Sequence, residues 1–277
     1  MVPNPRQLIL KLLLAANHGE LSARAAVASC GLFGIRENSV RVALVRLASA
    51  GLVEAAARGS YRLGPSAAGL AADVGTWRSA EQRVRAWRGG WVAVHVGNLG
   101  RSDRAALRAR DRALLLLGLR ELDRGLFLRP DNLVGGVANV RERLHTLGLQ
   151  EDAAVFLASE LDPARDTRAR TLWNGKALTR SYRQTRQQLD KWRQRAGRLD
   201  PEAAARESFL LGNDAIRQLV FDPLLPEPLV DISERSAFVA AVLEFDRAGR
   251  DIWSRLLQPL EAESQRSETH RRSLELS

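Results

Sequence analysis

The sequence has 277 residues, 45% of them hydrophobic, and a formal net charge of +10. This length allows two or three compact domains, and the positive charge favours a polyanionic partner. A single cysteine, Cys30, excludes an internal disulfide framework and fits a reducing compartment. Apolar runs such as Ala113 to Leu117 are far shorter than a membrane span. We therefore expect a soluble, cytoplasmic protein without a membrane segment.

The first 65 residues combine short helices with a hairpin. Helices are predicted at Arg6 to Ala16, from Ser22 to about Cys30, and at Asn38 to Ala50. The hairpin has strands Leu52 to Ala57 and Tyr61 to Leu63 on either side of the tip Arg58-Gly59-Ser60. Three short helices followed by a two-stranded wing are typical of a winged helix-turn-helix. Residues 1–65 are therefore predicted to form a DNA-binding domain of this type.

The remaining chain changes pattern twice. A linking helix is predicted over residues 66–90, and residues 91–162 then follow the order β-α-β-β-α-β, which is the ferredoxin-like arrangement. The elements expected in this region are strand Trp91 to Gly97, helix Arg101 to Leu117, strands Leu119 to Leu122 and Leu126 to Leu128, helix Asn132 to Leu147, and strand Ala153 to Leu157.

Residues 163–262 are predicted to be a helical domain, with helices Thr171 to Ala196, Pro201 to Phe221 and Ser233 to Leu260. The Ser-rich, charged residues 263–277 are expected to be a disordered tail. The sequence thus predicts an α+β protein with an N-terminal winged helix-turn-helix, a central ferredoxin-like domain and a C-terminal helical domain.

The third helix carries the clearest functional pattern. Its apolar stripe can pack on the first two helices, and its opposite side combines polar groups with two valines. That outward side consists of Asn38, Arg41, Val42 and Val45, flanked by Ser39 and Arg46. We expect Arg41 on a guanine edge, Asn38 on an adenine edge, and the valines on thymine methyls. The flanking residues, together with Arg36, suit phosphate oxygens.

A solvated helix face with two exposed valines would explain the same pattern. The hairpin favours DNA binding, because Arg58 and Arg62 flank Gly59-Ser60 and place charge on a thin wing. In a twofold dimer, two recognition helices would lie about 34 Å apart, or a multiple of this distance. The expected partner is then double-stranded DNA with an inverted-repeat operator.

Five stretches carry a family likeness, in the right order along nearly the whole chain. GLFGIRENSVRVALVRLASAGLVEAAARGSYRLG resembles the N-terminal domain of the phenylacetate-degradation repressor family, the PaaX-type regulators. WRGGWVAVHV and LGLRELDRGLFLRPDNL resemble the central, Cas2-like domain of that family. TLWNGKALTRSY and FLLGNDAIRQLVFDPLLPEPL resemble its C-terminal helical segments.

The resemblance implies a homodimer, with residues 91–162 as the Cas2-like dimerisation domain, that represses genes for the catabolism of aromatic compounds. It also implies release from DNA when an acyl-CoA effector such as phenylacetyl-CoA binds. By position, Arg41 and Arg46 match DNA contacts of the family, and Tyr61 matches a residue that packs the wing. After DPLLPEPL the family continues to a Trp and a Gly, whereas this chain has VDISERSAF. The effector-binding residues therefore stay unassigned.

The sequence predicts no catalytic residue, no metal site and no cofactor. Its four histidines are scattered, and phosphate-loop and nucleophile-elbow patterns are absent. A metal-dependent nuclease built on the Cas2-like domain is an alternative. Its expected metal position is Asn98, however, and the first acid, Asp103, lies at the helix start. A non-enzymatic scaffold that binds RNA or protein through its arginines is another alternative.

Overall fold

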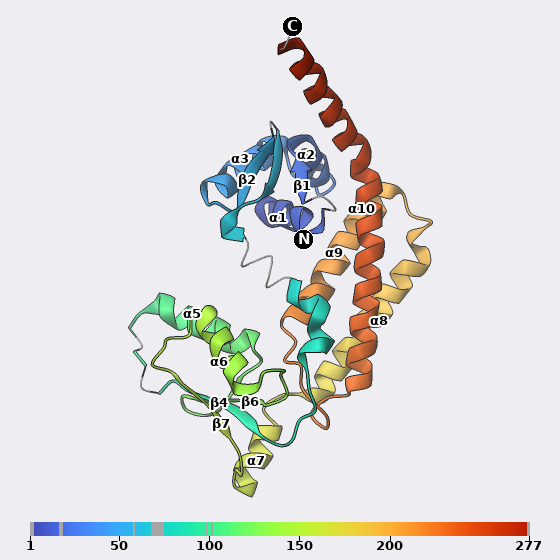
Figure 1. Ribbon diagram of the computed structural model, residues 1–277. Helices are drawn as coiled ribbons and strands as arrows, with labels where there is room; N and C mark the ends of the chain where they lie inside the picture. The colour runs from blue at the N-terminus through green and yellow to red at the C-terminus, as the bar shows by residue number, and fades with distance from the viewer. Residues whose placement is uncertain are drawn as a thin grey trace. The chain divides into compact units, whose positions relative to one another are not determined.

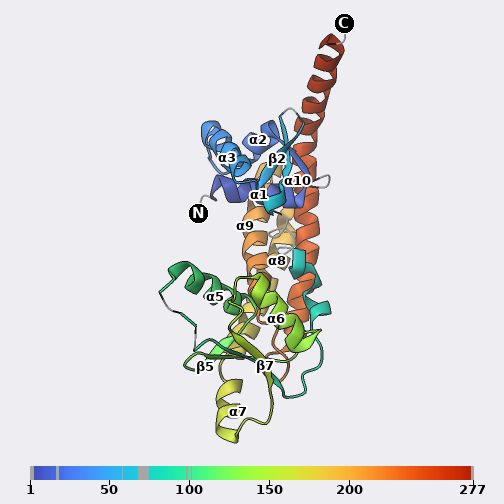
Figure 2. The same cartoon turned by 60° about the vertical axis from the view of Figure 1, so that its left-hand side comes forward.

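A computed structural model describes residues 3–16, 19–57, 59–67, 75–97, 99–100 and 102–275. The protein is mixed α+β with two small antiparallel sheets, which confirms the α+β class of the prediction (Figures 1 and 2). The chain forms two compact units, each built from separate stretches of sequence. Unit 1 takes the described residues of Met1–Thr76, Lys191–Asn213 and Leu243–Ser277. Unit 2 takes those of Trp77–Asp190 and Asp214–Val242.

Unit 1 begins with three helices and a small sheet. The helices are α1 (Pro5–Ala15), α2 (Ala23–Gly31) and α3 (Glu37–Ser49). Ser22 caps α2 as predicted, because its hydroxyl accepts a hydrogen bond from the Ala25 amide at 3.1 Å. Asn4 caps α1 in the same way, accepting from the Arg6 amide at 2.9 Å. These caps explain why both helices begin within one residue of the predicted starts.

The sheet of unit 1 contains the predicted hairpin and one additional strand. Strands β2 (Val53–Ala57) and β3 (Ser60–Leu63) form the hairpin, and β1 (Glu20–Ser22) pairs with the free edge of β3. The sheet order is therefore β1-β3-β2. Gly59 at the tip has φ +82°, a left-handed conformation that glycine adopts without strain. The three-residue β1 was not predicted because it is too short to display an alternating pattern.

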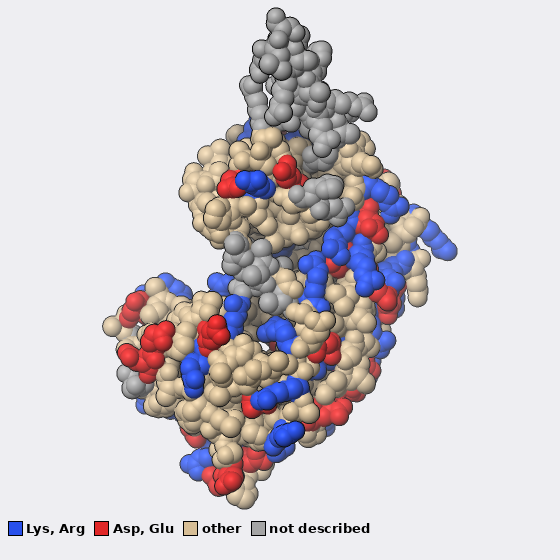
Figure 3. Space-filling view, in the orientation of Figure 1, with Lys and Arg blue, Asp and Glu red and all other residues tan. Residues whose placement is uncertain are grey.

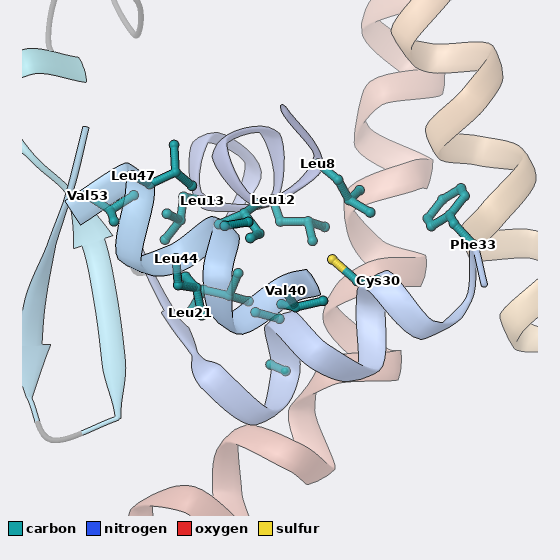
Figure 4. Packing of buried hydrophobic residues seen from close by; sticks show 14 of the residues in the cluster. Leu8, Leu12, Leu13, Leu21, Cys30, Phe33, Val40, Leu44, Leu47 and Val53 are labelled. Carbon is teal, nitrogen blue, oxygen red and sulfur yellow. The ribbon is translucent and has the colours of Figure 1, made fainter. Parts of the chain in front are cut away.

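The core of unit 1 extends beyond the first 65 residues. Leucines of α1 pack with Val40, Leu44 and Leu47 of α3 and with Val53 of β2 (Figure 4). Ala205 and Trp253, far along the chain, belong to the same buried cluster. The sequence-based division places residues 1–65 and 163–262 in separate domains. In the structure, parts of the C-terminal helices complete the core of the N-terminal elements.

Unit 2 contains a four-stranded antiparallel sheet with helices on one face. Its elements are β4 (Trp91–His95), α5 (Arg104–Leu116), β5 (Arg120–Asp123), β6 (Leu126–Pro130), α6 (Gly136–Thr146) and β7 (Ala154–Ala158). The strand order is β5-β6-β4-β7. Helices α5 and α6 cover the sheet through Leu114 and Leu144, which share a buried cluster with Val92, Val94 and Val155. The order of elements is the predicted one, with boundaries shifted by a few residues.

The segment between the two sheets differs from the predicted linking helix of residues 66–90. It contains two short 3₁₀ helices, Pro65–Ala67 and Thr76–Arg83, and the second has a kink at Ser79. Residues 68–74 lie outside the described residues. Val84 then forms a β-bridge with Leu133, so the linking-helix prediction is wrong for residues 84–90. Backbone pairing with the loop after β6 replaces the expected helical hydrogen bonds there.

The C-terminal part contains α7 (Pro163–Arg170), α8 (Gly175–Ala196), α9 (Pro201–Val220) and α10 (Ile232–Glu275). Helix α10 includes residues 263–275, for which the sequence predicts disorder. No helix of the described residues is both long and apolar enough to span a membrane.

Buried polar groups anchor the segment Asp222–Leu229 within unit 2. The Arg129 guanidinium is 2% exposed and donates to the carbonyl oxygens of Leu117, Pro130 and Pro223. Burial lowers the pKa of Arg129 to about 9, so the group stays protonated at neutral pH. Arg235, also buried, donates to the carbonyl oxygen of Leu225. These cations hold a backbone segment that is neither helix nor strand.

Candidate nucleic-acid interface

The outward side of α3 is exposed to solvent. Val40, Ala43, Leu44 and Leu47 are at most 3% exposed and face the core. On the other side, Val45 is 65% exposed and Val42 is 42% exposed. All six residues predicted for this side of the helix are exposed: Asn38, Ser39, Arg41, Val42, Val45 and Arg46. Arg36, the residue before the helix, is exposed as well.

The two exposed valines do not contribute to the core. Fully burying a valine side chain stabilises a fold by roughly 1.5–3 kcal/mol, and neither valine gains this stabilisation. They lie on the same side of the helix as Arg41, so apolar and basic groups are interleaved there. Such a surface can contact both thymine methyl groups and acceptor atoms on base edges.

Among the described residues, Arg41 pairs with Glu37 on the same helix, a contact that was not predicted from the sequence. Its Nε and Nη2 donate to Oε1 of Glu37, at 2.8 and 2.6 Å. The two side chains are 67% and 55% exposed, and an exposed pair of this kind contributes about 0–1 kcal/mol to stability. The i,i+4 spacing of Glu37 and Arg41 could have predicted the contact. Arg41 can therefore exchange Glu37 for a base edge at little cost to folding.

Arg36 and Arg46 form no ion pair with any described residue, which leaves both guanidinium groups available for phosphate oxygens. The basic side chains of α8 differ in this respect. Figure 3 shows Lys and Arg gathered over the C-terminal helices together with carboxylates. Arg183, Arg193 and Arg195 pair there with glutamates at 2.5–2.9 Å.

The wing is less basic than the sequence predicts. Arg62 on β3 pairs with Glu54 of β2 at 2.7 Å, because the two residues face each other in the hairpin register. On the other side of β3, Glu20 of β1 lies opposite Arg62 in the register of the two strands. Arg58 lies outside the described residues. Tyr61 is half-buried against the core of unit 1, in agreement with its expected packing role.

The residues that bear on catalysis have other roles. The carboxylate of Asp103 caps α5 by accepting hydrogen bonds from the amides of Ala105 and Ala106. Asn98 lies outside the described residues, among which no group of three His, Cys, Asp or Glu side chains could hold a metal ion. Burial raises the pKa of the Cys30 thiol to about 12, so its nucleophilic thiolate form is disfavoured.

This chain opens with three helices and a hairpin, and one face of its third helix is exposed. The family model for PaaX-like proteins matches residues 4–67, and the model for the PaaX-like protein C-terminal domain matches residues 173–255. The two matches cover more than half of the chain, which therefore belongs to the PaaX-like family.

A solved structure supports the overall similarity. The chain is similar to the uncharacterized protein Rv0674 from Mycobacterium tuberculosis, with 25% sequence identity and a TM-score of 0.56. The similarity covers 89% of this chain and 99% of that protein. A search of curated proteins gives no match.

Proposed function

We propose that this protein is a DNA-binding transcriptional regulator that reads its operator through the outward side of α3. The observation that carries the proposal is the exposure of Val45 and Val42 beside Arg41 on a helix whose opposite side is fully buried. A recognition helix needs such a surface, whereas a purely structural helix gains nothing from it.

The arrangement of the neighbouring elements supports a winged helix-turn-helix. Helices α1, α2 and α3 precede a hairpin, and α2 is joined to α3 by a short turn. The strand order β5-β6-β4-β7 in unit 2 likewise supports a ferredoxin-like, Cas2-like domain. By membership of the PaaX-like family, we infer that residues 91–162 form a homodimer. A twofold dimer of this kind presents two α3 helices to an inverted repeat.

Each exposed residue has a proposed contact on duplex DNA. Arg41 takes a guanine edge, Asn38 an adenine edge, and the valines contact thymine methyl groups. Arg36, Ser39 and Arg46 contact phosphates, and Arg58 and Arg62 of the wing add contacts to the backbone. The protein acts by binding and needs no cofactor. The family supports repression of an operon for aromatic-compound catabolism, which an acyl-CoA such as phenylacetyl-CoA relieves.

A binding experiment tests the proposal. Labelled duplexes from the promoter of the protein's own gene and of its neighbours are titrated with the full chain at moderate salt. A scrambled duplex of the same composition serves as the reference. We expect one promoter duplex to bind at least about 10³-fold more tightly than the scrambled duplex. Equal affinity for all duplexes would contradict the proposal.

The effector is tested separately on the complex with DNA. Addition of phenylacetyl-CoA is expected to release the operator, whereas free coenzyme A is not. Continued specific binding in the presence of acyl-CoA thioesters would remove the effector from the proposal and leave DNA reading intact.

A further inference from the structure

The turn between α2 and α3 determines the direction in which α3 leaves the domain. The amides of Phe33 and Ile35 both donate to the carbonyl oxygen of Cys30, at 3.0 and 3.2 Å. Gly34 between them has φ +71°, which closes the turn without strain at this position. Although Phe33 lies on a connecting turn, its side chain is only 8% exposed. A buried aromatic side chain on a turn indicates a tertiary partner.

That partner is α9, whose contacting residues lie in the same compact unit. The ring of Phe33 meets the ring of Phe209 edge-to-face, with centroids 5.3 Å apart. Figure 4 shows the Phe33 side chain beside the C-terminal helices, and Phe33 shares the buried cluster of the α1 leucines. One turn earlier on α9, Nη1 of Arg206 donates to the carbonyl oxygen of Leu32 at 3.2 Å. Two side chains of α9 thus contact adjacent residues of one turn.

The contact continues into the C-terminal helices. Phe209 packs edge-to-face against Trp253 of α10, with ring centroids 6.3 Å apart. Ala205, one helical turn before Phe209, is fully buried in the core that α1 and α3 share. Phe209 and Arg206 therefore belong to a helix face that is fixed at several points, and the turn before α3 rests on this face.

Val40, Leu44 and Leu47 bury the inner side of α3 in the core of unit 1, which also contains Ala205 and Trp253. The α9 contacts act on the turn that precedes the helix. A side chain of α3 must lie within about 0.5 Å of its ideal position to read a base edge, because hydrogen bonds to bases tolerate little error in position. The contacts that α9 makes with the turn before α3 can supply that precision.

We propose that Arg206 and Phe209 are positioning residues for DNA reading: from α9 they hold the turn before α3 and fix how the outward side of α3 meets the major groove. This inference rests on the proposed function. It follows that residues 1–67 alone are an incomplete DNA-reading unit. It also follows that a movement of α9 against the turn changes operator affinity while every DNA-contacting residue stays intact. The C-terminal helices thereby offer a route for regulation.

The first test compares two arginine variants of the full chain. Arg206→Ala removes the bond to the turn, and Arg255→Ala is the matched control. Arg255 is an exposed arginine of unit 1, and its side chain bonds to the carbonyl oxygen of Asp251 in its own helix. Both variants lose one positive charge. We expect Arg206→Ala to bind the operator about three- to ten-fold more weakly than the control, with equal affinity of the two variants for a scrambled duplex. Equal operator affinities would overturn the inference.

The second test uses rescue at Phe209. Phe209→Ala removes the ring, whereas Phe209→Leu retains an apolar side chain against Phe33. The ratio of operator to scrambled-duplex affinity is measured well below the melting temperature, with the folded fraction checked by circular dichroism. We expect Phe209→Ala to lower the ratio about five-fold or more and Phe209→Leu to restore most of it. A folded Phe209→Ala variant with the wild-type ratio would overturn the inference.

Two features keep the tests decisive. If Phe209→Ala does not fold, the comparison of Arg206→Ala with Arg255→Ala still reports on the contact. If the wild-type chain itself shows no operator preference, the proposed function fails. If the wild-type chain prefers the operator and all three variants keep this preference, the further inference fails and the proposed function stands.

Discussion

The outward side of α3 and the polar network of unit 2 both depend on arginine, but they use it in opposite ways. Arg41 is 67% exposed and has one local partner on its own helix. Arg129 is 2% exposed and donates to three backbone carbonyl oxygens from different segments. The first arrangement leaves the cation available to a ligand, and the second commits the cation to the fold. Net charge alone does not distinguish the two.

The difference has an energetic basis. A buried guanidinium has lost its water, and every carbonyl oxygen that it satisfies would be left unpaired by its removal. An exposed ion pair stays hydrated and contributes little to stability. Changes in unit 2 should therefore alter the free energy of unfolding, whereas changes on α3 should alter DNA affinity. Substitutions in the two regions test this separation, from the largest expected effect to the smallest.

Arg129→Met should have the largest effect on stability. Methionine fills the apolar part of the site but donates no hydrogen bond to the carbonyl oxygens of Leu117, Pro130 and Pro223. We expect the free energy of unfolding to fall by roughly 2–4 kcal/mol, measured by urea denaturation. Arg120→Met, at an exposed position of β5, is the control and should change it by less than about 0.5 kcal/mol. Similar losses for both variants would contradict the assigned role of Arg129.

Arg41→Ala should affect DNA binding and leave folding nearly unchanged. We expect the operator affinity to fall by about 1–3 kcal/mol, with the loss concentrated at one base pair of each half-site. The free energy of unfolding should change by about 0.5 kcal/mol or less, because only the exposed pair with Glu37 is lost. Competition among operator duplexes with single base-pair changes measures both points. A loss that is the same for every duplex would mean that Arg41 contacts phosphate and not a base.

Asp222→Asn should change the pH dependence of stability. Burial raises the pKa of Asp222 above the ordinary value of 3.8, against the opposing effects of Tyr182, the Leu224 amide and Arg235. The folded state therefore binds a proton more tightly than the unfolded state, and stability is lost as pH rises from the ordinary value through the folded pKa. The side-chain amide introduced by the substitution would stay neutral and keep an oxygen for the bond that Leu224 donates.

Melting curves between pH 4 and pH 8 measure this effect, since each kcal/mol corresponds to about 2–4 °C for a chain of this size. We expect the variant to melt above the wild type at pH 8 and to show a smaller difference at pH 4. A variant that melts lower at pH 8 would mean that the negative charge of Asp222 stabilises the fold.

Glu37→Gln should have the smallest effect, and it should raise the affinity for DNA where Arg41→Ala lowers it. Removal of a carboxylate from the DNA-facing helix reduces repulsion from phosphates, so affinity for a scrambled duplex should rise about two- to five-fold. Because Arg41 must leave Glu37 to reach a base edge, removal of this bond should at the same time raise the preference for the operator. Titrations of both duplexes at one salt concentration test the combination. An unchanged ratio of affinities would exclude Glu37 from DNA selection.

The sequence predicted the local features of unit 1 well. The buried and exposed sides of α3 follow from apolar residues at helical spacing, and Ser22 marks the start of α2 because its hydroxyl caps the first turn of the helix. The contact of Arg62 with Glu54 could also have been predicted, because pairing within the hairpin places the two residues opposite each other.

Features that depend on distant residues were not predictable from the local pattern. The linking helix fails where Val84 finds Leu133 as a β-bridge partner, which no local preference encodes. Arg129 follows Leu128 in a strand, where alternation predicts a solvent-facing residue, yet Asn132 and Pro223 enclose it. The contact of Phe33 with Phe209 spans most of the chain, so only the folded structure shows that α9 supports the turn before α3.

The most direct test of DNA reading by α3 is the introduction of a negative charge on its outward side. Val45→Glu places a carboxylate at a side chain that is 65% exposed, and Leu115→Glu does the same at a 43% exposed position on α5. Both variants should fold with wild-type stability within about 0.5 kcal/mol. We predict that Val45→Glu binds the operator at least about 30-fold more weakly, because a like charge then faces the DNA, and that Leu115→Glu binds as the wild type does. If a folded Val45→Glu variant retained wild-type operator affinity, α3 would not be the DNA-reading helix.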